Sequence, residues 1–179
     1  GVLIENDDFQ YNATTDPSGN FTIPNFFQGY YEATAGKWGY YTNCVSNQLI
    51  NISNNTMLIK LGKGIYDDFT FDFGWTVTGT AATGIWERGM PIGTDYNGTG
   101  DANPGVDVVQ DCSDFAYVTG NGGVSASFDD VDDGNTVLTS PLFDVSSFTD
   151  PYINYYRWFF NDGGFNPIDD TFKIKLTNG

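Results

Sequence analysis

Short apolar and aromatic runs, each broken within a few positions by Gly, Pro or Asn, restrict the fold of this chain more than any other feature. Tyr30–Ala35 lies between Gly29 and Gly36 as one such run. Residues 16–20 are typical of a turn, because Pro fixes φ and Gly accepts positive φ. No segment shows a sustained apolar repeat at helical spacing. The pattern therefore predicts an all-β chain of short strands, as in β-sandwiches.

Further strands are expected wherever apolar side chains alternate or aromatic and β-branched residues gather. These places are residues 21–23, 47–51, 57–61, 69–77, 116–119, 136–139, 153–160 and 171–176. The 179 residues include 15 Phe, 11 Tyr and 4 Trp, a composition that favours strands over helices and suffices for packed cores.

Charge divides the chain into two parts. Residues 1–64 carry five acids and three lysines, whereas residues 65–179 carry the other 18 acids and four basic residues. This asymmetry predicts two modules with a boundary in the sequence Leu61-Gly62-Lys63-Gly64. We expect one β-sandwich over residues 1–63 and a second, acidic one over residues 64–179.

The residue inventory excludes several activities. The chain has no His, so Ser/His/Asp and Cys/His hydrolysis and zinc sites with imidazole ligands are excluded. Only three Glu occur, and none suits the carboxylate pair of a glycosidase. The net charge of −16 disfavours nucleic acid and anionic membranes as partners, and no apolar run approaches the ~20 residues of a membrane span. We expect no enzymatic activity and no membrane insertion.

The first module contains an ordered series of Thr-Asp, Gly-x-Phe and Gly-x-Tyr motifs. They occur in Thr14-Thr15-Asp16-Pro17-Ser18-Gly19-Asn20-Phe21-Thr22-Ile23-Pro24-Asn25, Gly29-Tyr30-Tyr31 and Gly36-Lys37-Trp38-Gly39-Tyr40. This series resembles the carboxypeptidase regulatory-like family over about the first 62 residues. The resemblance implies a transthyretin-like seven-stranded sandwich with a structural role in a secreted bacterial protein, and its first strand would precede Gly1.

The second module carries another set of motifs. They are Asp67-Asp68-Phe69, Gly74-Trp75-Thr76-Val77, Gly84-Ile85-Trp86-Glu87-Arg88-Gly89, Tyr117-Val118-Thr119-Gly120, Asp132-Asp133-Gly134-Asn135-Thr136-Val137-Leu138-Thr139-Ser140-Pro141, Tyr155-Tyr156-Arg157-Trp158 and Asp170-Thr171-Phe172. The set is similar to the accessory β-jelly-roll, related to MAM and concanavalin-like sandwiches, of secreted bacterial peptidases and adhesins. The resemblance implies that at least one further strand would follow Gly179.

Missing strands have a physical consequence, because an unclosed sandwich exposes an edge and an apolar slot. Either a neighbouring molecule donates the strand and builds a fibre by β-augmentation, or the sequence simply stops within the fold.

The acidic run at residues 129–135 contains four carboxylates and one amide. Like charges so close repel one another unless solvent or a cation screens them, and Ca²⁺ accepts six to eight hard oxygen ligands from loops. The resemblance implies a structural calcium ion bound by Asp68, Asp132, Asp133 and Asp170. The alternative is a solvated acidic turn.

Aromatic side chains raise a second binding hypothesis. Flat rings such as those of Trp86 and Trp158 can stack on sugars, although aromatic residues of β-sandwiches more often belong to the core. Both faces of residues 155–160 are aromatic, so this strand is either buried on both sides or binds something.

Cys44 and Cys112 are the only cysteines, and they fall in different predicted modules. They either form one cross-link in an oxidising compartment or remain as two small hydrophobic side chains.

Two functional hypotheses follow. The first is a calcium-stabilised accessory module of a secreted or cell-surface peptidase or adhesin, whose partners are other domains of the same chain. The second is a structural subunit of an extracellular filament or surface layer, whose partners are neighbouring protomers. A carbohydrate-binding module, with glycans as partners, is the third.

Overall fold

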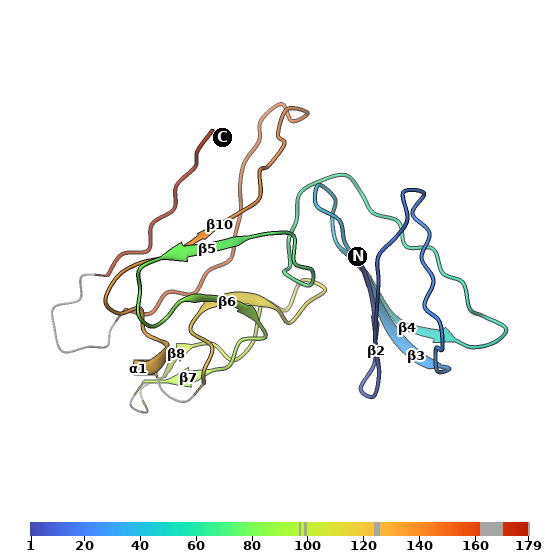
Figure 1. Cartoon of the computed structure of the whole chain (residues 1–179), viewed down its shortest axis with the longest axis horizontal. Coiled ribbons are helices and arrows are strands. Elements are labelled where there is room, and N and C mark those ends of the chain that lie inside the picture. Colours follow the sequence, from blue (N-terminus) through green and yellow to red (C-terminus); the bar gives the residue numbers. More distant parts are fainter. Residues whose placement is uncertain (97, 99, 124–125, 162–169, 179) are drawn as a thin grey trace. The chain divides into compact units, whose positions relative to one another are not determined.

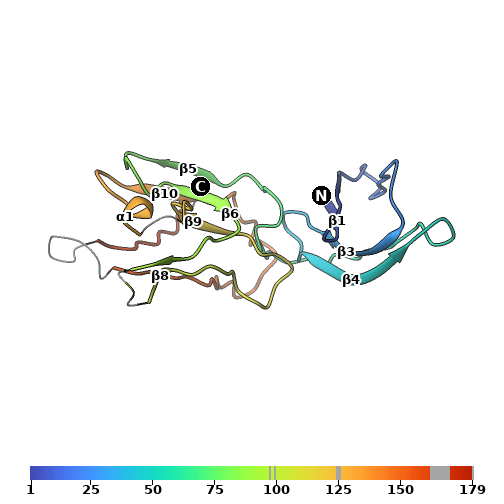
Figure 2. The same ribbon diagram turned by 90° about the horizontal axis from the view of Figure 1, so that it is seen from below.

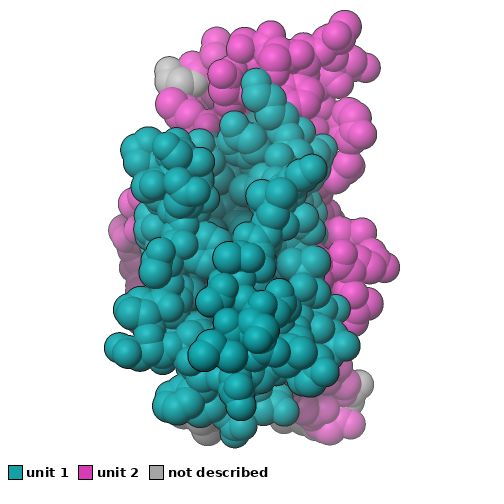
Figure 3. All heavy atoms as spheres, turned by 90° about the vertical axis from the view of Figure 1, so that its right-hand side faces the viewer, with its two compact units in different colours: residues 1–73 teal, residues 74–179 magenta. Residues whose placement is uncertain are grey.

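A computed structural model describes residues 1–96, 98, 100–123, 126–161 and 170–178 (Figure 1). Within these residues the chain forms ten short strands and a single helical turn, so the all-β prediction is confirmed. The chain divides into two compact units, Gly1–Phe73 and Gly74–Gly179, which Figure 3 shows in different colours. We call them unit 1 and unit 2 and describe each by itself.

Unit 1 is built on a four-stranded antiparallel sheet. Its strands are β1 (Val2–Glu5), β2 (Gln10–Ala13), β3 (Gly29–Ala35) and β4 (Asn43–Ile50), in the order β2-β1-β3-β4. Figure 2 labels β1, β3 and β4 of this sheet. Val2 lies opposite Ala13 of β2 and Ala35 of β3. Because side chains alternate along a strand, this register gathers the apolar residues of three strands on one face.

Two extended segments cover that face. The first segment contributes Phe21, Ile23 and Phe26, and the second contributes Met57, Ile59 and Leu61. These side chains pack against the buried residues of the sheet, which are Val2, Ile4, Tyr31, Ala33 and Ala35. Neither segment joins a ladder within the described residues, so the predictions of strands at 21–23 and 57–61 are wrong. The apolar pattern correctly indicates that these segments pack on the core, but it does not determine whether a neighbouring strand pairs with them.

Tyr31 is the centre of this core. Its side chain is 2% exposed, and its hydroxyl donates to the Phe27 carbonyl oxygen at 2.9 Å. The ring meets that of Phe26 edge-on, with centroids 4.7 Å apart, and Phe26 stacks on Tyr11 at 4.2 Å. Burial and the neighbouring Tyr11 raise the pKa of the Tyr31 hydroxyl.

Unit 1 extends past the boundary expected at residues 63 and 64. Phe71 lies so close to Gly1 and Gly36 that a Cβ atom on either glycine would come within 2.7 Å of its ring. Phe73 packs on Trp38, with ring centroids 5.9 Å apart. The boundary therefore falls after Phe73, because Phe71 and Phe73 pack on unit 1. The distribution of charge along the sequence does not reveal these two aromatic contacts.

Unit 2 contains three two-stranded antiparallel sheets. They pair β5 (Thr76–Gly79) with β10 (Thr136–Thr139), β6 (Trp86–Gly89) with β9 (Ala116–Thr119), and β7 (Thr94–Asp95) with β8 (Asp101–Asn103). The helical turn α1 (Ala126–Asp129) precedes β10. The strands predicted at 116–119 and 136–139 are confirmed, whereas 153–160 and 171–176 are extended but belong to no strand. The sandwich architecture of the two modules stays a prediction.

The turn predicted at residues 16–20 is present and is held by Asp16. One carboxylate oxygen accepts hydrogen bonds from the backbone N–H groups of Ser18 and Asn20, both at 2.9 Å. The Asn20 backbone and side-chain donors hold the pKa of this carboxyl below its usual value. The turn orients the chain as it enters the segment that carries Phe21 and Ile23.

Replacing Asp16 by alanine should lower the melting temperature at pH 7 by roughly 1–3 °C. A depressed carboxyl pKa stabilises the fold above the unfolded pKa, about 3.9, and this contribution is lost as the pH falls through the folded pKa. The melting temperatures of wild type and D16A should therefore converge as the pH falls below about 4 in a thermal titration. A constant difference across that range would contradict this assignment.

Candidate functional site

Asp68 is a buried carboxylate with an unsatisfied oxygen. Its side chain is 2% exposed, and Oδ1 accepts a hydrogen bond from the Thr70 backbone N–H at 3.1 Å. Oδ2 is buried and has no hydrogen-bond partner among the described residues. A buried carboxylate oxygen without a hydrogen-bond donor costs the fold free energy, so this atom is a candidate ligand for a cation.

The backbone around Asp68 is held in a tight conformation. The Phe69 N–H donates to Asp67 Oδ1 at 2.9 Å, so two successive Asp side chains each bond to the backbone two residues ahead. Phe69 has a φ of 59°, a left-handed conformation that is rare for an aromatic residue. Thr70 Oγ1 is a second buried oxygen without a partner in the described structure. A carboxylate and a hydroxyl, both hard oxygen ligands, are thus unsatisfied within three residues.

This environment fits the calcium ion implied by the resemblance. A hard cation satisfies a buried carboxylate oxygen, and Ca²⁺ also accepts hydroxyl and carbonyl oxygens without strict geometry. Of the predicted ligands, Asp68 is the one whose surroundings most need a positive charge. The buried oxygen of Thr70 had no counterpart in the sequence prediction, because burial of one hydroxyl leaves no sequence pattern.

Two of the predicted ligands, Asp132 and Asp133, lie on an exposed loop before β10. Asp132 and Asp133 are both exposed, and Asp133 has a left-handed φ of 56°. The loop is fastened through its carbonyl oxygens, since Asp132 accepts from the Ala82 N–H at 2.9 Å and Asn135 from the Thr80 N–H at 2.8 Å. The backbone therefore fixes the loop and leaves its carboxylates facing solvent.

Asp129 has a structural role at the start of the acidic run. It is 9% exposed, and its carboxylate accepts hydrogen bonds from the N–H groups of Gly122 at 2.9 Å and Gly123 at 3.2 Å. These bonds tie α1 to the segment that follows β9. Asp129 is thus occupied by backbone donors.

Two of the predicted ligands affect the pKa of Asp130. Partial withdrawal of its carboxyl from water, then the negative charges of Asp132 and Asp170, raise its pKa. Asp132 and Asp170, far apart in sequence, thus share an acidic neighbourhood. Sequence reasoning included Asp130 in the acidic run but did not select it as a ligand.

The four predicted ligands do not form one cluster. Asp68 belongs to unit 1 and Asp132, Asp133 and Asp170 belong to unit 2. In the part of the chain that the structure describes, no three Asp, Glu, Cys or His side chains lie close enough together to hold a metal ion. The shared calcium site therefore stays a prediction.

The two tryptophans proposed for sugar stacking have different environments. Trp86 is half-buried in β6 and meets the Phe172 ring edge-on at 6.5 Å. Trp158 is 55% exposed, and its indole N–H donates to the Ala102 carbonyl oxygen at 3.0 Å. Trp86 therefore packs within unit 2, whereas Trp158 leaves much of its ring accessible.

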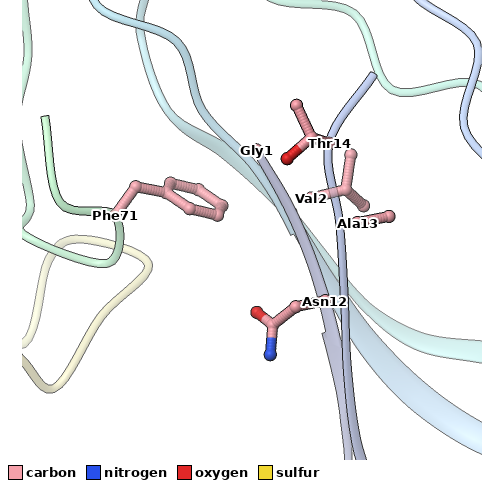
Figure 4. A pocket seen from close by; sticks show the side chains of 6 residues that line it. All are labelled: Gly1, Val2, Asn12, Ala13, Thr14 and Phe71. Atoms are coloured by element: carbon pink, nitrogen blue, oxygen red, sulfur yellow. The ribbon is translucent and has the colours of Figure 1, made fainter. Parts of the chain in front are cut away.

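A shallow hollow in unit 1 has polar side chains that can form hydrogen bonds. It has a volume of about 270 Å³ and is lined by Gly1, Val2, Asn12, Ala13, Thr14 and Phe71 (Figure 4). Asn12 and Thr14 supply the polar side chains of this lining, and Phe71 forms its aromatic wall. These two polar side chains can hydrogen-bond to a polar group, but neither is an effective general acid or base near neutral pH.

Comparison with protein-family models, with curated proteins and with solved structures finds no match to this chain. The described residues include no helix that is long and apolar enough to cross a membrane.

Replacing Asp130 by asparagine should raise the melting temperature in the presence of EGTA at pH 7 by roughly 1–3 °C. A raised carboxyl pKa means that ionised Asp130 destabilises the fold, and this penalty grows as the pH rises from the unfolded pKa through the folded one. The gain should therefore vanish near pH 3, where both states carry a protonated carboxyl. A lower melting temperature for D130N at pH 7 would contradict the proposed repulsion.

Both cysteines, Cys44 in β4 and Cys112 between β8 and β9, are disulfide-bonded. The purified native protein should therefore contain no thiol that reacts with Ellman's reagent before reduction. Reduction should lower its free energy of unfolding by about 2–4 kcal/mol, because a disulfide restricts the unfolded chain. Two reactive thiols in the native protein would contradict this bond.

Proposed function

We propose that the chain supplies non-catalytic structural modules to a secreted or surface-anchored protein, and that Ca²⁺ stabilises them. The observation that carries the proposal is the buried Asp68 Oδ2 atom, which lacks a hydrogen-bond donor among the described residues. A carboxylate in this environment costs the fold free energy unless a cation neutralises it. Asp68 and Thr70 would hold the ion, and Asp132, Asp133 and Asp170 are retained as further candidate ligands.

The residue inventory supports a structural role. The chain has no His, and the polar side chains that line the hollow in unit 1 are an amide and a hydroxyl. Neither group is an effective general base near neutral pH. We therefore place any catalytic or adhesive activity in other domains, which these modules would space, dock or anchor.

The disulfide supports the proposed location. Stable disulfides form mainly in secreted and cell-surface proteins, because the cytosol keeps thiols reduced. A net charge of −16 keeps a protein soluble and supplies a surface that attracts hard cations such as extracellular calcium.

Calcium should raise the melting temperature of the wild-type protein relative to the same protein in EGTA. A ligand at about 100 times its dissociation constant adds about 2.7 kcal/mol, which corresponds to roughly 5–11 °C for a chain of this size. Scanning calorimetry with CaCl₂, MgCl₂ or EGTA would measure the shift, which should be smaller with Mg²⁺ because that ion requires stricter octahedral geometry.

The variant D68N should lose most of the calcium-dependent shift. A matched control is D7N, which removes the same charge from an exposed carboxylate in the β1–β2 turn and should keep the full shift. A wild-type melting temperature that is identical in calcium and EGTA would overturn the calcium proposal. Loss of the shift in both variants would assign it to net charge and reject a site at Asp68.

A filament subunit is the second candidate function. It is favoured by a separate observation, the exposed apolar side chains along two extended segments of unit 2, and this observation carries the inference below.

A further inference from the structure

Two extended segments of unit 2 expose large apolar side chains to solvent. We name residues 152–160 the aromatic segment and residues 171–177 the lysine segment. In the aromatic segment Tyr152 is 82% exposed and Tyr156 is 71% exposed, and in the lysine segment Ile174 is 52% exposed and Leu176 is 77% exposed. Contiguous apolar exposure on this scale marks an interaction surface in a soluble protein.

The two segments touch at one end. Asn161 Nδ2 donates to the Asp170 carbonyl oxygen at 3.1 Å, and the rings of Phe159 and Phe172 lie 5.8 Å apart. The Arg157 guanidinium also lies over the Phe172 ring, 5.4 Å from its centroid. These contacts identify the residues that would face one another if the segments paired.

The contacts define an antiparallel register. If Asn161 lies opposite Asp170, Phe159 faces Phe172, and Trp158 and Tyr156 face Lys173 and Lys175. Each lysine would then lie beside an aromatic ring, an arrangement that favours cation–π contact. On the other face, Tyr155 would pair with Leu176. The side chains that alternate along the lysine segment thus face side chains of the aromatic segment that they can pack against.

The pairing is not continued in the structure. The segments run apart from their contact end towards the C-terminus (Figures 1 and 2). Backbone groups of residues 152–160 and 173–177 make no hydrogen bond with any described residue. A hollow of about 330 Å³ is lined by three consecutive residues, Arg157, Trp158 and Phe159. This hollow therefore borders the aromatic segment.

We propose that a second copy of this chain occupies the backbone edge of the aromatic segment, by adding its lysine segment to the aromatic segment of the first copy. An unpaired edge accepts an added strand through its backbone groups, and the added side chains decide which strand fits. The complementary strand is present in the chain itself, so each copy carries both the donor and the acceptor. Exchange of an identical element between copies is a low-cost route to assembly.

The charge of the lysine segment reduces the repulsion between two acidic copies. This segment contains two of the seven basic residues of the chain and no acid, whereas each copy has a net charge of −16. Added salt should therefore strengthen self-association, because it screens repulsion between the acidic copies while the apolar and ring contacts persist. This inference rests on the structural role proposed above, and it names a second copy of the chain as the partner.

Disulfide trapping of the predicted register tests the inference. The variants Y155C and L176C are mixed in calcium-containing buffer at 0.5 M salt, oxidised mildly and separated without reduction. Facing Cα atoms in a sheet lie about 4.5–5.5 Å apart, within the range that a disulfide spans. The mixture should give a covalent dimer in at least tenfold excess over the control mixture of Y156C with L176C, because residue 156 points to the opposite face. Equal yields in the two mixtures would overturn the register.

Self-association without cross-linking provides the second measurement. Sedimentation equilibrium of the wild-type chain should show dimers or larger species, and L176E should weaken the association at least tenfold, because a buried leucine contributes about 1.5–3 kcal/mol. V109E is the control, since Val109 is also highly exposed, at 89%, but lies outside both segments. A wild-type chain that stays monomeric, together with an exclusively intramolecular bond in the double variant Y155C/L176C, would overturn strand exchange. If calcium still raised the melting temperature, that result would reject the exchange and leave the calcium-stabilised module standing.

Discussion

Antiparallel backbone pairing is the constraint on which this structure depends. Every extended segment must bury one face and satisfy the hydrogen-bonding groups along its edges, and the chain achieves both in the four-stranded sheet of unit 1. There the register of β1 and β3 places small and aromatic side chains on one face, where Tyr31 fills the centre. Elsewhere extended segments bury part of a face while their edges stay unpaired among the described residues, and the proposed strand exchange uses one such edge.

Electrostatics divides the carboxylates by their surroundings. Asp16 and Asp129 receive backbone N–H groups and stabilise a turn and a helix end. Asp68 has one oxygen satisfied in this way and one without a donor, and Asp130 meets the like charges of Asp132 and Asp170. The same side-chain chemistry thus stabilises local structure where donors converge, and it is left unsatisfied or repelled by like charges where they are absent.

Sequence reasoning predicted the parts of the fold that local chemistry determines. The Asp16–Asn20 turn and the strands at 116–119 and 136–139 were predicted because Pro, Gly and β-branched residues act on their own backbone. Residues 57–61 carry the same alternation as a strand but pair with no strand among the described residues, since pairing depends on residues distant in sequence. The surroundings of Asp68 lay beyond prediction for the same reason: the sequence marks an acidic pair, whereas burial of one oxygen depends on how the chain packs around it. The position of Asp170 beside Asp130 likewise comes from tertiary structure.

The aromatic anchors at the end of unit 1 affect how this chain can be divided. Phe71 occupies the space that the missing Cβ atoms of Gly1 and Gly36 leave open, and Phe73 lies beside Trp38. A fragment that stops at residue 63 would keep every strand of the four-stranded sheet but would bare those glycines and one face of the indole. The smallest piece of unit 1 suited to isolated study therefore ends at residue 73, and a side chain larger than hydrogen at Gly36 would expel the Phe71 ring even from that piece.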